Sequence, residues 1–508
     1  MSNTYGTHLD RSARQLAQGT FFVLAGQAAF VAGGYLLHFY LARVIDPVAY
    51  GTYGLIMNVL TWTESALNSG VPWAVRKWLP ADPQSAPRIL GMGLRWQMLV
   101  GVLLSAATLL LTPWFTGAVR DSGLTFYLRL AFADIIVMAL YTFYRAALNG
   151  LRQFPAQGAS MAAYTVAKLA SSVLLVGLSR SVTGAIVGNI VGSVGGWLAA
   201  WFFLRRASVS DSGISAHADA PQVYTGRTLL SFALPSMLFT LAGNFLTTLG
   251  LIGVKALVQD GVQVAYYSAA NYLATAPTLL LIAFSLTLFP HLAGSIAAKN
   301  WPLTRAYIQS AVRYLAVVLL PGTLIVLGTS RQIVSILYPP HYAAAAPLLN
   351  LLLVSTGLQS LYLVFANAIL AEGRTLLALS IPGALVPVSL LCTWYLTGRF
   401  GSAGAATAAV LTTALAAVAA AWYVVRRFAV RLPWASLARI TTASLAVYSL
   451  TQLPVLRGFG LIPHVLLLGV VYLALLVLLQ EITRADMARW RTDLAGAARK
   501  WKAGGTRA

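Results

Sequence analysis

The sequence predicts an all-α polytopic membrane protein with about fourteen transmembrane helices. Hydrophobic residues make up 58% of the 508-residue chain and charged residues only 9%, whereas about a quarter of the residues of a soluble domain are charged. The mean hydropathy is +0.74. Since one span with its loop takes about 35 residues, the chain has room for about fourteen spans and little room for a soluble domain.

Fourteen apolar runs are long enough to cross about 30 Å of hydrocarbon. They lie at residues 19–42, 49–72, 89–113, 126–148, 157–179, 182–204, 229–254, 263–289, 308–329, 343–370, 375–397, 402–425, 436–454 and 460–480. Strands are excluded because the runs are too long and do not alternate. A segment that spans a membrane must also satisfy its own backbone hydrogen bonds, which these runs can do only as helices.

The basic residues predict the orientation. With the N-terminus inside, 26 of the 35 Lys and Arg residues fall on the inner side and eight on the outer side. This positive-inside bias predicts that both termini are cytoplasmic. We expect the protein in the cytoplasmic (inner) membrane, as a multi-pass protein. The same bias also accounts for most of the net charge of +22, so we infer no nucleic-acid partner.

A polar stretch at residues 206–227 separates the first six spans from the last eight, and a short motif at 143–152 recurs at 365–374. Because six is an even number, a repeat across this stretch has parallel topology. We therefore expect two six-helix lobes in a parallel pseudo-repeat, plus two C-terminal helices. The predicted parts are an N-lobe at 1–205, a cytoplasmic linker at 206–227, a C-lobe at 228–430, spans 13 and 14 at 431–481, and a tail at 482–508.

The tail has the pattern of a basic amphipathic helix. Met487, Trp490, Leu494, Ala497 and Trp501 recur at spacings of three and four, and basic residues occupy other positions. Such a helix binds anionic phospholipids at the cytoplasmic face. A disordered basic tail is the alternative.

Glu64 is a candidate for the transport cavity. An ionisable side chain in mid-span costs roughly 3 kcal/mol, so it is expected to face an aqueous cavity or a partner. Glu64 shares one helix face with Thr61 and Asn68. It could therefore bind a coupling ion, such as a proton or sodium, or a group of the substrate. Hydrogen bonding within the lobe is the alternative.

Asp134 and Lys168 are the other two candidates for the cavity or for coupling. They lie about 12 Å and about 17 Å below the outer edge of two consecutive antiparallel spans. We expect them to be within salt-bridge reach. The pair could be functional, or it could only hold two helices together.

A polar cleft between the lobes is expected to hold the substrate. Hydroxyls and amides can receive sugar hydroxyls, although interhelical hydrogen bonds are their commoner use. Arginines at the cytoplasmic mouth can bind phosphate through two parallel hydrogen bonds. The predicted cleft residues are Gln27, Asn68, Arg76, Arg145, Asn244, Tyr267 and Asn271. His38, near the outer interface, is expected to be solvated.

The sequence does not favour an enzyme. The single cysteine, Cys392, excludes a disulfide framework and a cysteine-based metal site. There is no Walker A sequence for ATP. The outer loops are short and hold only Asp46, Asp121 and Asp260 as acids, which disfavours a membrane-embedded glycosyltransferase or polymerase. We predict no catalytic residue, no metal and no cofactor.

Four segments carry a family resemblance, at residues 41–56, 70–76, 337–348 and 370–374. They resemble the helix 1 to 2 loop, the end of helix 2 and the helix 9 to 10 region of the polysaccharide transport branch of the multidrug/oligosaccharidyl-lipid/polysaccharide (MOP) exporter superfamily. The resemblance is spread over the whole length of the chain.

This resemblance implies a flippase or exporter that works by alternating access. Its substrate would be a lipid-linked oligosaccharide of the polyprenyl-pyrophosphate type, or a related glycolipid, moved to the outer leaflet for surface polysaccharide biosynthesis. A cation-coupled multidrug antiporter and a lipid II flippase stay open as alternatives. Drug cations would favour acidic walls in both lobes, and lipid II flippases carry basic residues in helices 1, 2 and 8 that we do not find. A monomer is expected.

Overall fold

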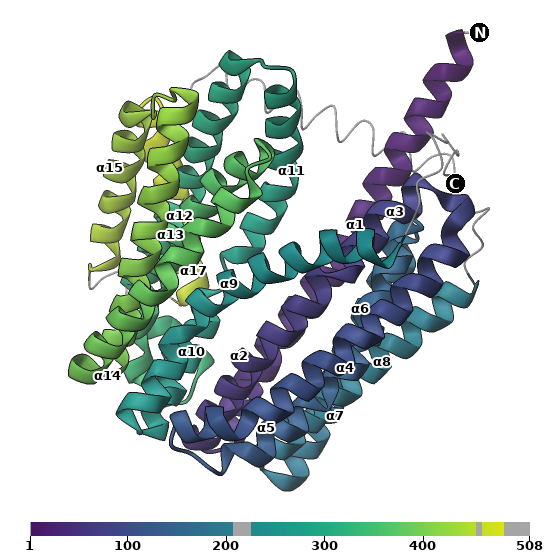
Figure 1. Cartoon of the computed structure of the whole chain (residues 1–508). Coiled ribbons are helices and arrows are strands. Elements are labelled where there is room, and N and C mark those ends of the chain that lie inside the picture. The colour runs from purple at the N-terminus through teal and green to yellow at the C-terminus, as the bar shows by residue number, and fades with distance from the viewer. Residues whose placement is uncertain (1, 207–224, 454–459, 482–508) are drawn as a thin grey trace. The chain divides into compact units, whose positions relative to one another are not determined.

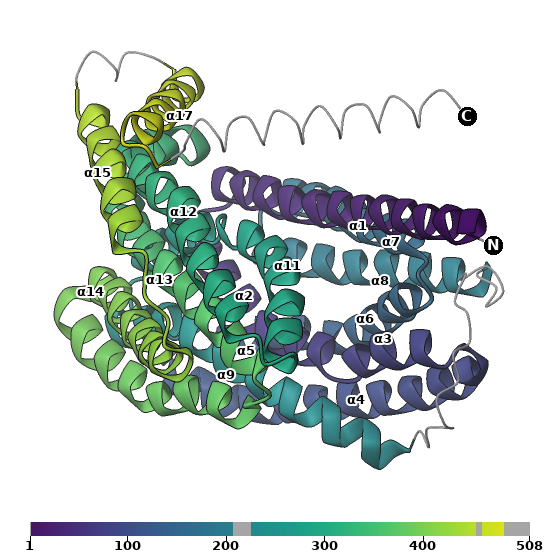
Figure 2. The same ribbon diagram turned by 90° about the horizontal axis from the view of Figure 1, so that it is seen from above.

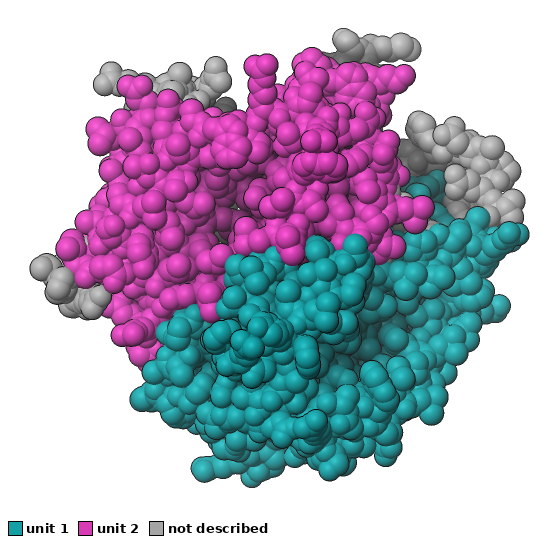
Figure 3. Space-filling model, turned by 60° about the vertical axis from the view of Figure 1, so that its left-hand side comes forward, with its two compact units in different colours: residues 1–272, 337–348, 382–412 teal, residues 273–336, 349–381, 413–508 magenta. Residues whose placement is uncertain are grey.

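The computed structural model describes residues 2–206, 225–453 and 460–481, and every element in these ranges is a helix (Figure 1). The prediction of an all-α membrane fold is confirmed. The helices form two compact units, coloured separately in Figure 3. Unit 1 comprises residues 1–272, 337–348 and 382–412, and unit 2 comprises residues 273–336, 349–381 and 413–508.

Unit 1 contains the helices of the first six predicted spans and the two helices that follow them. They are α1 (Ser2–Val44), α2 (Pro47–Ser69), α3 (Val71–Ala81), the short 3-10 helix η1 (Pro83–Ser85), α4 (Ala86–Ala118), α5 (Leu124–Phe132), α6 (Asp134–Gly150), α7 (Phe154–Ser179), α8 (Val182–Arg206), α9 (Gly226–Val258) and α10 (Gly261–Ala274). The 3-10 helix η3 (Pro340–Ala344) and the middle of α14 complete the unit.

Local sequence signals set both ends of α2. The Asp46 side chain accepts a hydrogen bond of 3.0 Å from the backbone N–H of Ala49, and Pro47 is the first helical residue, a combination that favours helix initiation. The helix ends at Gly70, which has φ −84° and ψ −113°, and Pro72 lies in the first turn of α3. The run predicted as one span at 49–72 is therefore divided at Gly70.

Glycines bring α7 and α8 close together, and both ribbon views show the two helices side by side (Figures 1 and 2). Gly184, Gly188 and Gly192 repeat every four residues along the face of α8 that meets α7. A Cβ atom at Gly192 would lie 2.6 Å from the Cβ atom of Lys168. Such a close approach is typical of small residues between membrane helices. It places the backbone and the Cβ atom of Lys168 directly against α8.

The helix α9 packs against α2 and α3. Leu229 and Ala233 of α9 share a buried apolar cluster with Val71, Val75 and Leu79 of α3. Residues on both sides of the predicted linker therefore belong to unit 1, and the division into units does not fall at 206–227. The lobe boundaries stay a prediction. Most of the linker and the whole tail at 482–508 lie outside the described residues.

A glycine divides the long helix α14 (Thr375–Phe428) into two helices. Gly401 has φ +60° and ψ −139°, a conformation essentially restricted to glycine. The Oε1 atom of Gln263 accepts a hydrogen bond of 3.2 Å from the backbone N–H of the next residue, Ser402. The division at Gly401 agrees with the two separate runs predicted at 375–397 and 402–425.

Unit 2 consists of α11 (Thr278–Ala297), α12 (Trp301–Leu337), α13 (Ala345–Ala371), the two ends of α14, α15 (Trp434–Thr451) and α17 (Leu461–Leu478). The predicted run at 263–289 is interrupted between Ala274 and Thr278. Pro277 lacks a backbone N–H and disfavours a helical conformation in the residue before it. Each of the fourteen predicted runs overlaps a helix, but by length and hydropathy ten described helices qualify as spans. The number fourteen stays a prediction.

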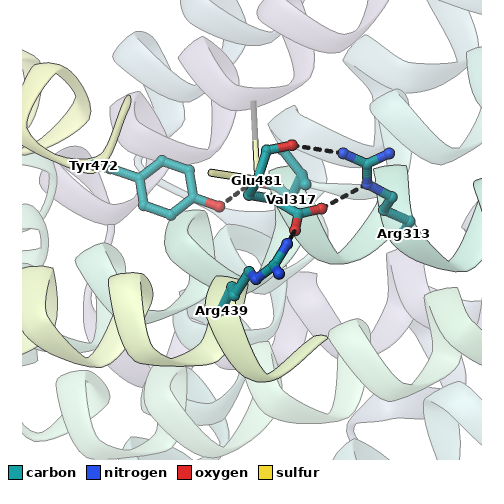
Figure 4. Close-up of polar contacts among 5 residues, drawn as sticks. All are labelled: Arg313, Val317, Arg439, Tyr472 and Glu481. Carbon is teal, nitrogen blue, oxygen red and sulfur yellow. Dashed lines mark hydrogen bonds and ion pairs between the residues drawn. The ribbon is translucent and has the colours of Figure 1, made fainter. Parts of the chain in front are cut away.

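A buried carboxylate clamps three helices of unit 2 together (Figure 4). The Glu481 side chain is 1% exposed, and its Oε1 atom lies 2.6 Å from Nε of Arg313 on α12 and its Oε2 atom 3.7 Å from Nη1 of Arg439 on α15. The Tyr472 hydroxyl of α17 donates a hydrogen bond of 2.9 Å to the backbone carbonyl of Val317 on α12. The clamp therefore fixes the C-terminal end of α17 to α12 and α15.

We expect Glu481→Ala to destabilise unit 2, because it leaves two guanidinium groups without their shared carboxylate. The arginines are 36% and 45% exposed, so the cost should be about 1–3 kcal/mol rather than the larger cost of a fully buried pair. Thermal unfolding in detergent measures it. Glu481→Gln, which keeps the volume and one acceptor, should lose less. An unchanged unfolding midpoint for Glu481→Ala would contradict the clamp.

Candidate functional site

Two arginines of unit 1 converge on one amide oxygen. The Oδ1 atom of Asn68, at the end of α2, accepts hydrogen bonds from Nη2 of Arg76 on α3 (3.1 Å) and from Nη2 of Arg145 on α6 (2.8 Å). The Arg145 guanidinium also lies 5.2 Å from the centre of the Tyr141 ring. The sequence prediction placed these three residues in one cleft, and the structure brings them into direct contact.

The guanidinium groups of Arg76 and Arg145 keep unused hydrogen-bond donors. Both Nε atoms are buried and have no hydrogen-bond partner. Among the described residues, neither arginine forms an ion pair with a carboxylate. Two cations side by side, each with a free donor and neither paired with a carboxylate, form an arrangement that can bind an anion.

Gln97 of α4 joins the end of α2, which carries Asn68, to the middle of α6, which carries Arg145, and the sequence prediction missed it. Its buried Nε2 group donates to the backbone carbonyls of Leu67 (3.2 Å) and Ala139 (3.3 Å) and to the hydroxyl of Thr142 (3.2 Å). Leu67 lies in the last turn of α2, where carbonyls lack helical donors. A lone amide in the apolar run at 89–113 was the signal that could have identified it.

Glu64 lies on α2 one turn before Asn68, and its side chain is partly buried. Its carboxylate is within electrostatic range of Lys168 and Arg145, but no hydrogen bond or ion pair joins it to another described residue. Glu64 is thus a carboxylate near two cations and bound to neither of them. Its place in the cavity stays a prediction.

The predicted ion pair between Asp134 and Lys168 is wrong. The Oδ2 atom of Asp134, at the start of α6, accepts hydrogen bonds from Nδ2 of Asn189 (2.8 Å) and from Oγ of Ser193 (2.9 Å), both on α8. The ammonium group of Lys168 instead lies 5.7 Å from the centre of the Tyr164 ring. Asp134 faces α8, whose neutral donors bind its Oδ2 atom in place of Lys168.

A chain of neutral groups extends from Asp134. The Tyr164 hydroxyl of α7 donates to Oδ1 of Asn189 (3.2 Å), whose amide group donates in turn to Asp134. Oδ1 of Asp134 is buried without a hydrogen-bond partner. Lys168 remains within electrostatic range of Asp134 and of Glu64. The three charges predicted for coupling therefore share one interior region of unit 1 without direct contact.

The uncharged candidates lie on other helices of the same unit. Gln27 of α1 and Asn271 of α10 are half-buried, and Tyr267 of α10 is fully buried against Gly250 of α9. Asn244 of α9 is half-buried, and its backbone carbonyl accepts a hydrogen bond from Thr248 (2.8 Å). No bond in the described part of the chain joins these four residues to the arginine pair, so a common cleft stays a prediction.

His38 differs from expectation. It is 7% exposed rather than solvated. Its Nδ1 atom lies 3.1 Å from the hydroxyl of Tyr50, and its ring stacks on the ring of Tyr272 with centres 3.5 Å apart. Aromatic side chains from α2 and α10 cover it, which the sequence of α1 alone could not reveal. Across the described residues, no cluster of three or more His, Cys, Asp or Glu side chains forms a metal site.

Solved structures share this fold at low sequence identity. The lipid II flippase MurJ in an inward closed conformation aligns with a TM-score of 0.69 and 13% identity, over 90% of this chain and 98% of that chain. An inward-facing multidrug resistance transporter of the MATE family aligns with a TM-score of 0.65 and 16% identity, over 78% of this chain and 94% of that one. A MOP superfamily transporter from Pyrococcus furiosus, whose binding pocket is described as having reverse polarity, aligns with a TM-score of 0.58 and 14% identity, over 82% of this chain and 95% of that one.

No curated protein matches the sequence significantly. The family model described as "Polysaccharide biosynthesis protein" matches residues 16–295, which is more than half of the chain. The MATE family and Pyrococcus furiosus structures are described as transporters of the MOP superfamily, and this chain shares their fold. The chain belongs to the polysaccharide biosynthesis protein family.

Proposed function

We propose that this protein is a flippase for a lipid-linked oligosaccharide on a polyprenyl-diphosphate carrier. It moves this lipid by alternating access from the cytoplasmic to the outer leaflet of the cytoplasmic membrane, for surface polysaccharide biosynthesis. Both termini are cytoplasmic, the chain acts as a monomer, and the basic tail binds anionic phospholipids of the inner leaflet.

The arginine pair carries this proposal. Arg76 and Arg145 share one neutral acceptor, Asn68, and each retains a buried Nε donor. A diphosphate offers two adjacent phosphoryl groups, and each could take Nε and Nη of one guanidinium in a bidentate contact. Asn68 is then a positioning residue for the arginines rather than a substrate contact. The sugars are received by hydroxyl and amide groups, among them Gln27, Asn244, Tyr267 and Asn271.

The same pair disfavours a multidrug antiporter for cations. An organic cation gains nothing from two guanidinium groups that form no ion pair with a carboxylate, and like charges in one site cost several kcal/mol. A lipid II flippase also moves a diphosphate lipid, so the arginine pair does not exclude it. The two lipid substrates differ in their sugars and peptide, and transport of each in vesicles separates them.

We assign the coupling step to Glu64. A coupling ion acts by binding the inward-facing and outward-facing states with different affinity. Glu64 is a partly buried carboxylate that lies near Lys168 and Arg145 and bonds to neither of them. Its protonation therefore changes the local balance of charge without the loss of a structural ion pair. Asp134, held by Asn189 and Ser193, is the weaker candidate.

Substitution of the arginines tests the substrate. Arg76→Gln and Arg145→Gln should each slow the flipping of a fluorescent polyprenyl-diphosphate oligosaccharide in proteoliposomes by about 10-fold to 100-fold. This is the effect expected when a charge-assisted hydrogen bond of about 1.5–3 kcal/mol is lost. Arg145→Lys should restore only part of the activity, because an ammonium lacks the guanidinium fork. The matched control is Arg88→Gln on α4, since Arg88 is exposed. Normal flipping by both glutamine variants would refute the arginine site.

Substitution of Glu64 tests the coupling. Glu64→Gln should still bind the lipid-linked oligosaccharide but lose the pH dependence of transport, because glutamine mimics only the protonated state. The assay is the initial flipping rate in vesicles between pH 5.5 and pH 8, with Asp260→Asn, an exposed loop acid, as the control. If Glu64→Gln keeps the rate and pH profile of the unmodified protein, Glu64 has no part in coupling, and a substrate gradient or the membrane potential drives transport.

A further inference from the structure

The beginnings of α2 and α10 approach each other so closely that no side chain fits at three of their glycine positions. A Cβ atom at Gly51 would lie 2.8 Å from the backbone nitrogen of Ala265, and one at Gly54 would lie 2.5 Å from Oγ of Ser268. From the other side, a Cβ atom at Gly261 would lie 2.6 Å from Cγ1 of Val48. Glycines from both helices therefore let the two backbones meet at this end of unit 1.

Hydrogen-bonding aromatic side chains join the same elements. The hydroxyl of Tyr338, just after α12, lies 3.2 Å from the hydroxyl of Tyr50 on α2, which lies 3.1 Å from Nδ1 of His38 on α1. The His38 ring is stacked on Tyr272 of α10, whose backbone carbonyl accepts a hydrogen bond from the hydroxyl of Tyr35 (3.2 Å). This buried relay links α1 and α2 to α10 and to the segment after α12.

An ion pair adds a third connection. The Nζ atom of Lys255, near the end of α9, lies 2.6 Å from Oδ2 of Asp121, in the loop between α4 and α5. Burial alone would raise the pKa of Asp121, but the hydrogen bond and the charge of Lys255 outweigh burial and lower it. The ion pair connects another two segments from either side of the predicted linker.

All three connections join the predicted N-lobe at 1–205 to the predicted C-lobe at 228–430. We propose that they form a latch, made of the glycine contacts, the Tyr338–Tyr50–His38 relay and the Asp121–Lys255 pair, that closes this end of the transporter and opens once in each transport cycle. This inference rests on alternating access as the mode of the proposed function. It does not depend on which lipid is moved.

The chemistry of the latch suits repeated opening. Hydroxyl, imidazole and ion-pair contacts exchange for contacts with water at a small net cost, because water replaces each lost partner. An apolar contact of similar extent would instead expose its whole area to water, which is unfavourable in proportion to that area. The glycines define the closed geometry because they let the backbones of α2 and α10 pack closely. The polar contacts keep the free-energy difference between the closed and open states small.

A disulfide across the latch tests this inference. In a Cys392→Ala background, which removes the only cysteine of the chain, Val48→Cys and Gly261→Cys form the test pair. A Cβ atom at Gly261 would lie 3.2 Å from Cβ of Val48, close to the separation of about 3.5–4.5 Å in a disulfide. The control pair is Gly33→Cys and Thr165→Cys, which joins α1 to α7 within the predicted N-lobe, with a corresponding separation of 3.7 Å.

We expect the oxidised test pair to flip a fluorescent polyprenyl-diphosphate oligosaccharide at least 10-fold more slowly in proteoliposomes, and a reductant to restore the rate. The control pair should transport equally well when oxidised and reduced, with disulfide formation confirmed by mass spectrometry. Full activity of the oxidised test pair would overturn the latch.

A second measurement separates failure of the latch from failure of the substrate. Spin labels at Val48→Cys and Asp260→Cys, both at exposed positions, report the distance across the latch in nanodiscs without any substrate assay. Two distance populations support a latch that opens. A single short distance under all conditions, including added lipid-linked oligosaccharide, would overturn it whatever lipid the protein moves.

Discussion

Inside the bilayer, a polar group must find its partner within the protein, since no water is there to replace it. This constraint explains most of the interior of unit 1. Asp134 accepts hydrogen bonds from Asn189 and Ser193, and Gln97 satisfies carbonyls of two neighbouring helices. Some buried polar atoms of unit 1 nevertheless have no hydrogen-bond partner, among them Oδ1 of Asp134, Oε1 of Gln97 and the Nε donors of Arg76 and Arg145. We assign substrate binding to the two arginines because they are cations that form no ion pair with a described carboxylate. We assign coupling to Glu64, whose carboxylate bonds to no described residue.

The repeated apolar runs were sufficient to predict the helices, because burial in lipid imposes length and composition on every span. They were not sufficient to predict where helices break. Gly70 with Pro72, and Pro277, interrupt runs that read as continuous, and both signals are visible in the sequence. Gly401 divides α14 into two helices, and this division lies between the two apolar runs predicted at 375–397 and 402–425.

The site was predicted in part. Helical spacing placed Asn68 on the same face as Glu64, and the positive charge of the mouth identified Arg76 and Arg145. Spacing within one helix says nothing about which neighbour it faces, so the partners of Asp134 were predicted wrongly and Gln97 was missed. His38 was expected in water for the same reason, since its covering residues Tyr50 and Tyr272 come from helices that are distant in sequence.

The helix α2 connects the two proposed parts of the machinery. Tyr50 and Gly51 of the latch lie at its beginning and Asn68 of the anion site at its end, about 27 Å apart at 1.5 Å per residue. Any shift of α2 on binding a diphosphate between Arg76 and Arg145 is transmitted along a rigid helix to the latch. Glu64 lies on the same helix, between the two.

The most direct test of the central claim is the retention of short-chain polyprenyl lipids by the purified protein in native mass spectrometry. The account predicts that a polyprenyl-diphosphate disaccharide is retained at least 10-fold more strongly than the matching monophosphate. This preference should disappear in the Arg76→Gln, Arg145→Gln double variant. Equal retention of the two lipids, or a preference that survives in the double variant, would contradict the assignment of the arginine pair to the diphosphate.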